Sequence, residues 1–226
     1  MDRKSFLIKE FLQVKNKFPK LKIGELNINS PIIIFGEIDI CDSSGEYWET
    51  FEIKIILDQG YPYSVPLVYE TSNLIKREDK RHIEIDGKCC LDIPYILVKL
   101  AKKGIVLHEF IEQKVYAFFA NQIFYSEKSY FLNGEYEHEE WGIYQFYTEL
   151  LGSSDIDLFI QFLEALKKGV GRNDQCPCGS TGKMKYCHAE ASKFLKSLGA
   201  RVLNSDLEQF KKLRNEVFKN KIDYNT

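Results

Sequence analysis

The sequence lacks a long apolar run, which excludes a transmembrane helix of about 20 consecutive apolar residues. It also lacks a charge imbalance, because Lys and Arg number 31 and Asp and Glu number 33. The basic character typical of nucleic-acid-binding and membrane-binding proteins is therefore missing. Residues 1–11 alternate charged and apolar side chains without a signal-peptide core, so we expect a cytoplasmic protein. Internal repeats and low-complexity tracts are also missing.

What is present is enough apolar material for a folded core. The 226 residues are 44% hydrophobic and 14% aromatic, which suits one medium domain with an appendage and a mixed α and β fold. Six cysteines occur, and in a cytoplasmic protein they are metal ligands, nucleophiles or buried thiols rather than disulfides. They are Cys41, Cys89, Cys90, Cys176, Cys178 and Cys187.

Hydrophobic spacing in the first third of the chain indicates a helix followed by strands. Residues 5–18 have helical spacing, and 31–40 is a short β-branched run. Residues 46–57 alternate apolar and charged side chains, as a half-buried strand does. A turn at 41–46 joins these two strands, and 67–70 is a further candidate strand, so we expect an antiparallel meander.

The rest of the chain is predicted to be irregular at first and then helical. Residues 71–94 are irregular and contain the paired cysteines, and 107–124 returns to helical spacing. The polar, aromatic stretch 130–142 is expected to be a loop. Two helices are expected within 143–169, separated at Gly152. A cysteine cluster follows at 171–188, and the remaining tail is helical.

The cysteine cluster has the composition of a metal site. Cys176 and Cys178 form a C-x-C pair, and after eight residues Cys187 and His188 complete the set. Zinc prefers four thiolate and imidazole ligands in a tetrahedron. A segment this short cannot bury a core, so metal binding would supply its folding free energy. The alternative is a set of unconnected residues, three of them small buried thiols.

Residues 171–188, GRNDQCPCGSTGKMKYCH, closely resemble the SEC-C motif, a zinc-binding tail found on SecA and on other bacterial proteins. The resemblance implies Zn²⁺ on the four residues named above and a protein partner for the knuckle. Asn173 and Asp174 are expected to order the knuckle without binding the metal. Lys183 and Lys185 make it mildly basic, which indicates a solvated face rather than nucleic-acid contact.

A second resemblance covers about residues 1–125. A meander, a Tyr-Pro with a further Pro nearby, a histidine, a glycine and a cysteine followed by Leu-Asp-Ile occur here in the order seen in the ubiquitin-conjugating enzyme (UBC-like) superfamily. The residues that match are Tyr61, Pro62, Pro66, Val68, His82, Gly87, Cys90, Leu91, Asp92 and Ile93.

This resemblance implies the fold class and the domain plan. The expected fold is α+β and UBC-like, with an N-terminal helix, an antiparallel β-meander and C-terminal helices, plus a small zinc knuckle. The implied domains are a UBC-like conjugating domain, a helical connector, the SEC-C zinc knuckle and a helical tail. Their expected ranges are 1–145, 146–170, 171–190 and 191–226.

The resemblance also implies a nucleophile. Cys90 takes the place of the cysteine that carries an activated C-terminus as a thioester, and Cys89 is expected to pack inward. The implied partners are a ubiquitin-like modifier or protein C-terminus and its activating enzyme. His82 is a candidate for proton transfer, although a structural role that ties the loop to backbone carbonyls is favoured. Backbone N–H groups of the loop could stabilise the oxyanion.

Two departures from the family bear on the acceptor. The family's His-Pro-Asn triplet is here His82-Ile83-Glu84, and the loop from His82 to Cys90 is about two residues shorter. Without the asparagine, transfer to lysine is in doubt, whereas thioester formation is not. Bacterial members of the fold often lack the triplet too, and the stretch 130–142 also resembles theirs. That resemblance implies a role in antiphage defence, with a nucleotide cyclase of a defence operon as a partner.

Two other function classes remain open from the sequence. The first is a non-catalytic adaptor in which the UBC-like domain and the knuckle are both docking surfaces. The second, a nucleic-acid-associated zinc protein, is opposed by the acidic net charge of −2. His108 and His138 have weaker claims to function than His82, and Cys41 is expected to be a buried thiol at a strand end.

Overall fold

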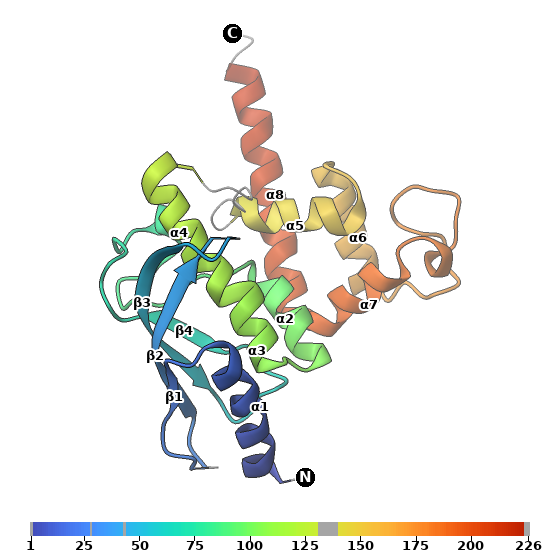
Figure 1. Cartoon of the computed structure of the whole chain (residues 1–226). Coiled ribbons are helices and arrows are strands. Elements are labelled where there is room, and N and C mark those ends of the chain that lie inside the picture. Colours follow the sequence, from blue (N-terminus) through green and yellow to red (C-terminus); the bar gives the residue numbers. More distant parts are fainter. Residues whose placement is uncertain (1, 28, 43, 131–139, 224–226) are drawn as a thin grey trace. The chain divides into compact units, whose positions relative to one another are not determined.

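A four-stranded antiparallel sheet forms the centre of the N-terminal part of the chain in the computed structural model (Figure 1). The structure describes residues 2–27, 29–42, 44–130 and 140–223. The sheet has the order β1-β2-β3-β4, so each strand pairs with its neighbour in the sequence, as the predicted meander requires. The strands are β1 (Leu21–Ile23), β2 (Ile32–Cys41), β3 (Tyr47–Leu57) and β4 (Leu67–Glu70).

The register places every second side chain of the sheet in the core. Ile34 on β2 lies opposite Ile55 on β3, and Ile55 lies opposite Val68 on β4. All three are almost fully buried. The residues between them point to the other face, as the period of two in a strand requires. The alternation predicted for 46–57 is confirmed.

Helices cover the buried face of this sheet. Tyr116, in the π-helical segment Ile111–Tyr116, bonds through its hydroxyl to both the N–H and the carbonyl of Cys41, at 2.7 and 2.8 Å. The Phe119 ring stacks on Phe51 of β3 with ring centroids 4.6 Å apart. The helices of this N-terminal part of the chain are α1 (Arg3–Lys17), α2 (Pro94–Lys103), α3 (Leu107–Phe110) and α4 (Ala117–Lys128), with the π-helical segment joining α3 to α4.

The chain divides into two compact units, residues 1–135 and 136–226. In the second unit, α5 and α6 share an aromatic core with α8, built around Tyr147, Phe159 and Phe210. The Tyr147 hydroxyl donates a 2.7 Å hydrogen bond to the buried Asp206 carboxylate. The helices of this unit are α5 (Glu140–Leu151), α6 (Ile156–Lys167), α7 (Ala189–Leu198) and α8 (Ala200–Asp223).

Most of the predicted elements are confirmed, with four differences. β1 and α2 were not predicted, and the helix expected at 107–124 continues to Lys128. The loop expected at 130–142, with His138, lies mostly outside the described residues, and α5 begins at Glu140 within it.

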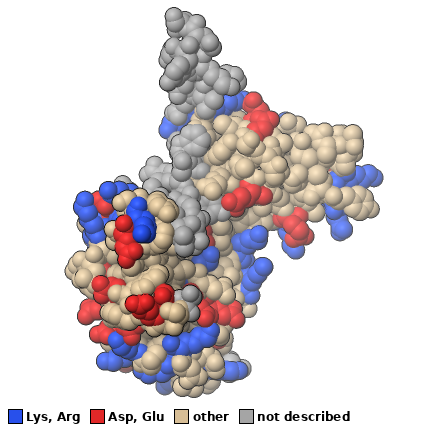
Figure 2. Space-filling view, turned by 45° about the horizontal axis from the view of Figure 1, so that its top comes forward, with Lys and Arg blue, Asp and Glu red and all other residues tan. Residues whose placement is uncertain are grey.

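The surface agrees with the balanced composition. On the face of the molecule seen in Figure 2, blue Lys and Arg and red Asp and Glu are interspersed over the N-terminal unit. Within the described ranges, the structure has no helix that is both long and apolar enough to cross a membrane.

Candidate functional site

Residues 82–90 form a short hairpin, called the thiol hairpin here because it carries both adjacent cysteines. Residues 85–87 form a three-residue loop that ends with Gly87 at a positive φ, the conformation that hairpin loops of this length favour. The Gly87 N–H donates to the Glu84 carbonyl at 2.9 Å, and the Glu84 N–H donates to the Lys88 carbonyl at 2.8 Å. These bonds fix the backbone of the two strands on either side of the turn.

The returning strand of the thiol hairpin pairs with β4. The Glu70 N–H donates to the Gly87 carbonyl and the Cys89 N–H donates to the Val68 carbonyl, both at 2.8 Å. Gly87 has a φ of +88°, and a Cβ built on it would lie 2.4 Å from the Glu70 carbonyl oxygen. Only glycine fits there without a shift of the backbone. The hairpin is therefore attached to the edge of the sheet rather than projecting freely.

This pairing sends the two adjacent cysteines to opposite sides. Cys89 points into the core and is 7% exposed, and burial raises the pKa of its thiol to about 12. Cys90 is exposed, and its N–H donates to the His82 carbonyl at 2.8 Å. The prediction that Cys89 packs inward is confirmed, and Cys90 has the exposure that a nucleophile needs.

His82 contributes to this arrangement through its main chain. Its φ of +51° is rare for a residue with a side chain, and this conformation presents its carbonyl to Cys90. A consequence is that the Cys90 N–H is already engaged and cannot serve as an oxyanion donor. Any such donor must come from another group near the thiol.

A buried ion pair supports the sheet edge beneath the thiol hairpin. The Glu70 carboxylate is buried and pairs with the Arg77 guanidinium, which also donates to the Glu70 carbonyl at 2.9 Å. Ser72 bonds the same carboxylate, and Arg77 reaches Asn73 Oδ1 at 3.0 Å. The charge of Glu70 is thus neutralised where water is excluded. Sequence reasoning missed this pair, since the stretch 71–94 has no regular spacing.

Two further contacts hold the ends of the thiol hairpin. Arg81 donates to the Gln122 carbonyl at 3.1 Å while the Gln122 amide donates to the Arg81 carbonyl at 2.9 Å, which ties the entering strand to α4. On the leaving side, Asp92 pairs with Lys114 at 2.5 Å. Asp92 also accepts the Ile93 N–H at 2.8 Å, just before α2 begins.

An ion pair lies on the outer side of the thiol hairpin. The Lys88 ammonium is 2.7 Å from Glu84 Oε1 across the two strands. The hydrogen bond to Glu84 raises the pKa of Lys88, and its electrostatic interactions with Glu84, Cys90 and Tyr69 add to the rise. Lys88 and Cys90 flank the inward Cys89, so both lie on the outer side of the strand. A permanent cation therefore lies within electrostatic reach of the exposed thiol.

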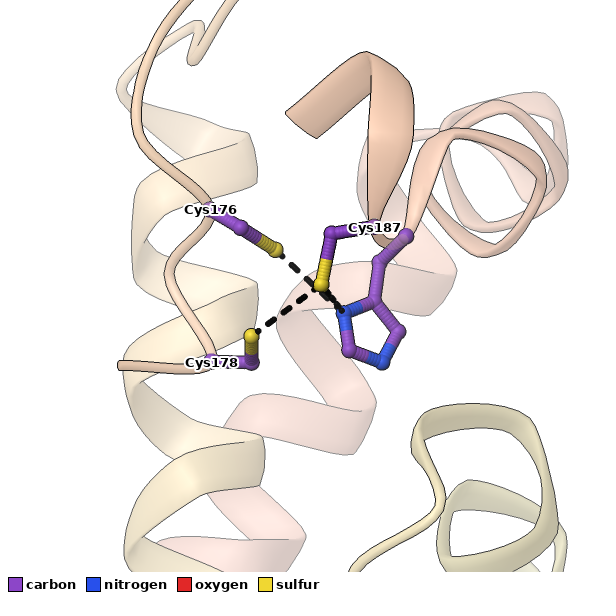
Figure 3. A group of neighbouring side chains, drawn as sticks. Cys176, Cys178 and Cys187 are labelled. Carbon is purple, nitrogen blue, oxygen red and sulfur yellow. Dashed lines mark hydrogen bonds between the residues drawn. The ribbon is translucent and has the colours of Figure 1, made fainter. Parts of the chain in front are cut away.

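The second candidate site is the knuckle (residues 171–188), where the four predicted ligands come together. Figure 3 shows the three labelled sulfur atoms pointing toward one another. Cys178 Sγ is 3.5 Å from Cys187 Sγ, and His188 Nδ1 is 3.3 and 3.1 Å from the Cys176 and Cys187 sulfurs. All four ligand atoms lie within 4.8 Å of one another. A tetrahedral zinc with ordinary bond lengths separates its ligand atoms by about 3.5–3.8 Å, so the set could hold one metal ion.

The imidazole of His188 is oriented for this role from outside the knuckle. Its Nε2 lies 3.2 Å from the Leu151 carbonyl at the end of α5. With the Nε2 proton donated there, Nδ1 directs its lone pair at the sulfurs, as a metal ligand requires. The Phe162 ring packs edge-on against the imidazole, with centroids 5.6 Å apart. Sequence spacing could not have indicated Leu151, which is 37 residues away.

Backbone bonds close the loop of the knuckle. The Cys176 N–H donates to the Gly182 carbonyl at 2.9 Å, and the Met184 N–H donates to the Asp174 carbonyl at 2.8 Å. The Asp174 carboxylate accepts the Gly171 N–H at 2.7 Å, so its predicted ordering role is confirmed. Burial acts to raise the pKa of Cys178, but bonds from Ser180 and the neighbouring thiols outweigh it and lower the pKa to about 6.

The remaining candidates lie outside both sites. Cys41 is half-buried rather than fully buried, because it ends β2 where the sheet meets solvent. His108 is half-buried in α3 and belongs to neither the thiol hairpin nor the knuckle.

Comparison of the chain with protein-family models, with curated proteins and with solved structures found no match.

Proposed function

We propose that this chain is a UBC-like conjugating protein that carries an activated C-terminus as a thioester on Cys90. The observation that carries the proposal is the separation of two adjacent thiols, one buried with a raised pKa and one exposed at the rim of the sheet. A helix, a four-stranded meander, a cysteine and then further helices follow in the order that the resemblance implies. This order supports the UBC-like assignment.

The chemistry uses the Cys90 thiolate twice. First it attacks the carbonyl carbon of a thioester held by the activating enzyme, and collapse of the tetrahedral intermediate expels that enzyme's thiolate. An amine or a second thiol then attacks the new thioester, loses its proton, and releases Cys90 as thiolate. Because the thioester keeps the acyl group activated, neither step needs a further oxidant or energy source.

Cys90 variants test this proposal directly. The full chain is incubated with ATP, a candidate activating enzyme and its modifier from the same operon, and separated without reductant. We expect an adduct that dithiothreitol removes, that Cys89→Ala retains and that Cys90→Ala lacks. A thiol-labile adduct that still forms in Cys90→Ala would contradict the proposal. Adjacent genes would be the source of these candidates, and a nucleotide cyclase encoded among them would be tested as the acceptor in antiphage defence.

We propose further that the knuckle binds Zn²⁺ through Cys176, Cys178, Cys187 and His188 as a SEC-C-type module for a protein partner. The support is the convergence of three sulfurs and one imidazole nitrogen whose tautomer is set by Leu151. Zinc would close the loop structurally, since all four positions are filled by protein ligands and no position remains for substrate. Metal analysis of the purified chain should give one zinc per chain.

An adaptor without catalysis is the second candidate, favoured by the outer face of the sheet. Ile33 and Phe35 of β2 and Leu67 of β4 are exposed there, on the two strands that flank β3, where a folded domain more often places polar residues. In an adaptor, Cys90→Ser would leave partner binding unchanged and no thiol-labile adduct would form. The adduct experiment above therefore separates the two candidates.

A further inference from the structure

The Lys88–Glu84 ion pair joins two residues of the thiol hairpin to each other and does not itself reach the sheet. The β4 pairing, the Gly87 turn and the Glu70–Arg77 pair already fix the backbone. The Lys88 and Glu84 side chains lie on the outer side and are 36% and 50% exposed. Surface pairs of this kind contribute little to the stability of a fold. What distinguishes this one is its place beside the exposed thiol.

Strand geometry puts Lys88 and Cys90 on one side. Cys89 points inward, so the residues before and after it point outward, with Cβ atoms about 6–7 Å apart. The ammonium can approach Cys90 Sγ by rotation of a flexible side chain, and it already interacts with Cys90 electrostatically. Opposite charges within about 6 Å stabilise each other's ionised forms.

We propose that Lys88 is a positioning residue that stabilises the Cys90 thiolate and that Glu84 moderates it by competing for the ammonium. The proposal rests on Cys90 being the acyl carrier, and it names a control on the reactivity of that thiol. Binding to Glu84 keeps Lys88 beside the hairpin but shares its charge. When a negative thiolate forms, the ammonium is attracted to both anions, so the pair adjusts without a change of backbone.

Other titratable groups near Cys90 also contribute to the electrostatic potential at its thiol. On the buried side, Glu70 and Arg77 neutralise each other, and Asp92 is paired with Lys114. The Asp86 carboxylate accepts the Lys88 N–H at 3.0 Å and so belongs to the turn. The groups on the elements around Cys90 are Tyr69 on β4, His82, Glu84, Asp86 and Lys88 in the hairpin, Asp92 after it, and Tyr95 and Lys99 on α2.

The test is the pH profile of Cys90 alkylation by iodoacetamide in the full chain, read by mass spectrometry at that residue. We expect Lys88→Gln to raise the midpoint of the profile by about 0.5–1 pH unit, because it removes the neighbouring cation. The alkylation rate at pH 7 should fall about two- to five-fold, because less of the thiol is ionised at that pH. The fall is smaller than the loss of thiolate alone, since the more basic thiolate is intrinsically more nucleophilic. Glu84→Gln should lower the midpoint, and Lys88→Arg should restore it.

Two controls separate charge from structure. Lys22→Gln removes the same charge from β1, at the opposite edge of the sheet, and should leave the midpoint unchanged because the distance exceeds a Debye length of about 8 Å. His82→Asn tolerates the positive φ and measures any contribution of the imidazole.

Different results would overturn the role of Lys88 and the acyl-carrier function of Cys90. A Lys88→Gln profile that matches the wild-type profile, or a shift equal to that of Lys22→Gln, would overturn the role of Lys88. This result would leave the acyl-carrier function standing, because adduct formation is measured separately. Conversely, a shifted profile in a chain that forms no adduct would retain the electrostatic role and reject the conjugation.

Discussion

The thiol hairpin and the knuckle are both short, cysteine-bearing segments without a core of their own, yet they are held in different ways. The hairpin is fixed by main-chain pairing to β4 and by the buried Glu70–Arg77 pair. The knuckle is closed by a few backbone bonds and by the convergence of four ligand atoms. Under the proposed function, the sulfurs of the knuckle would hold its structure together, whereas in the hairpin the backbone bonds do so and leave the exposed Cys90 thiol available for chemistry.

Loss of the proposed zinc ion should unfold the knuckle, and this is the largest effect that we expect. Zinc binding contributes about 10–16 kcal/mol to the folding of small zinc modules, far more than a few hydrogen bonds can replace. We expect Cys176→Ser to lose zinc and amide-exchange protection over residues 171–188 while the Cys90 alkylation rate stays unchanged. Cys41→Ser, a thiol outside the cluster, is the matched control and should keep one zinc. Full zinc occupancy in Cys176→Ser would contradict the ligand set.

Gly87→Ala should damage the hairpin most. A Cβ at this position meets the Glu70 carbonyl at 2.4 Å, so the β4 pairing has to open. We expect a loss of about 2–4 kcal/mol in the free energy of unfolding, measured in urea. Gly45→Ala is the control, because Gly45 has a φ of +87° but nothing within 4 Å of an added Cβ. It should cost only about 1 kcal/mol, and equal losses would show that the close approach is unimportant.

Arg77→Ala would leave the Glu70 carboxylate buried without a partner. The expected loss is about 3 kcal/mol, the usual result when one member of a buried ion pair is removed. Lys76→Ala serves as the comparison, since Lys76 pairs with Glu78 at a highly exposed position and should change stability by less than about 0.5 kcal/mol. If both variants unfolded at the same urea concentration, the buried pair would not support the hairpin.

The smallest effect concerns Cys89 in alkaline solution. The folded thiol has a pKa of about 12, and an unfolded thiol loses its proton near 8.5. Between these values the unfolded state binds fewer protons, so stability falls as pH rises, by about 1.4 kcal/mol per unit from this group. Cys89→Ala should remove that part of the slope between pH 9 and 10.5. A stability difference between the two proteins that stays constant over this range would contradict a buried, protonated Cys89.

The sequence predicted what short-range patterns determine. Alternation of apolar and charged residues with a period of two located β3, and four potential metal ligands within 13 residues of sequence located the knuckle. β1 was missed because three residues carry no period and depend on pairing with β2. α2 was missed because its apolar residues are consecutive and begin at Pro94.

The site was predictable to a similar extent. Exposure of Cys90 and burial of Cys89 were foreseen from the resemblance alone. Glu84 and Lys88 did carry a signal, two opposite charges flanking an Asp-Gly turn. The Glu70–Arg77 pair and the Leu151 carbonyl behind His188 gave none, because tertiary folding alone brings them together.

The most direct test of the account replaces one sulfur by oxygen. An acyl group on Cys90→Ser would be an oxyester, which resists dithiothreitol but is released by hydroxide, whereas the wild-type adduct is released by both. We predict this change of lability for Cys90→Ser and none for Cys89→Ser. If Cys89→Ser instead gave the thiol-resistant adduct, or if both variants kept a thiol-labile one, Cys90 would not be the acyl carrier.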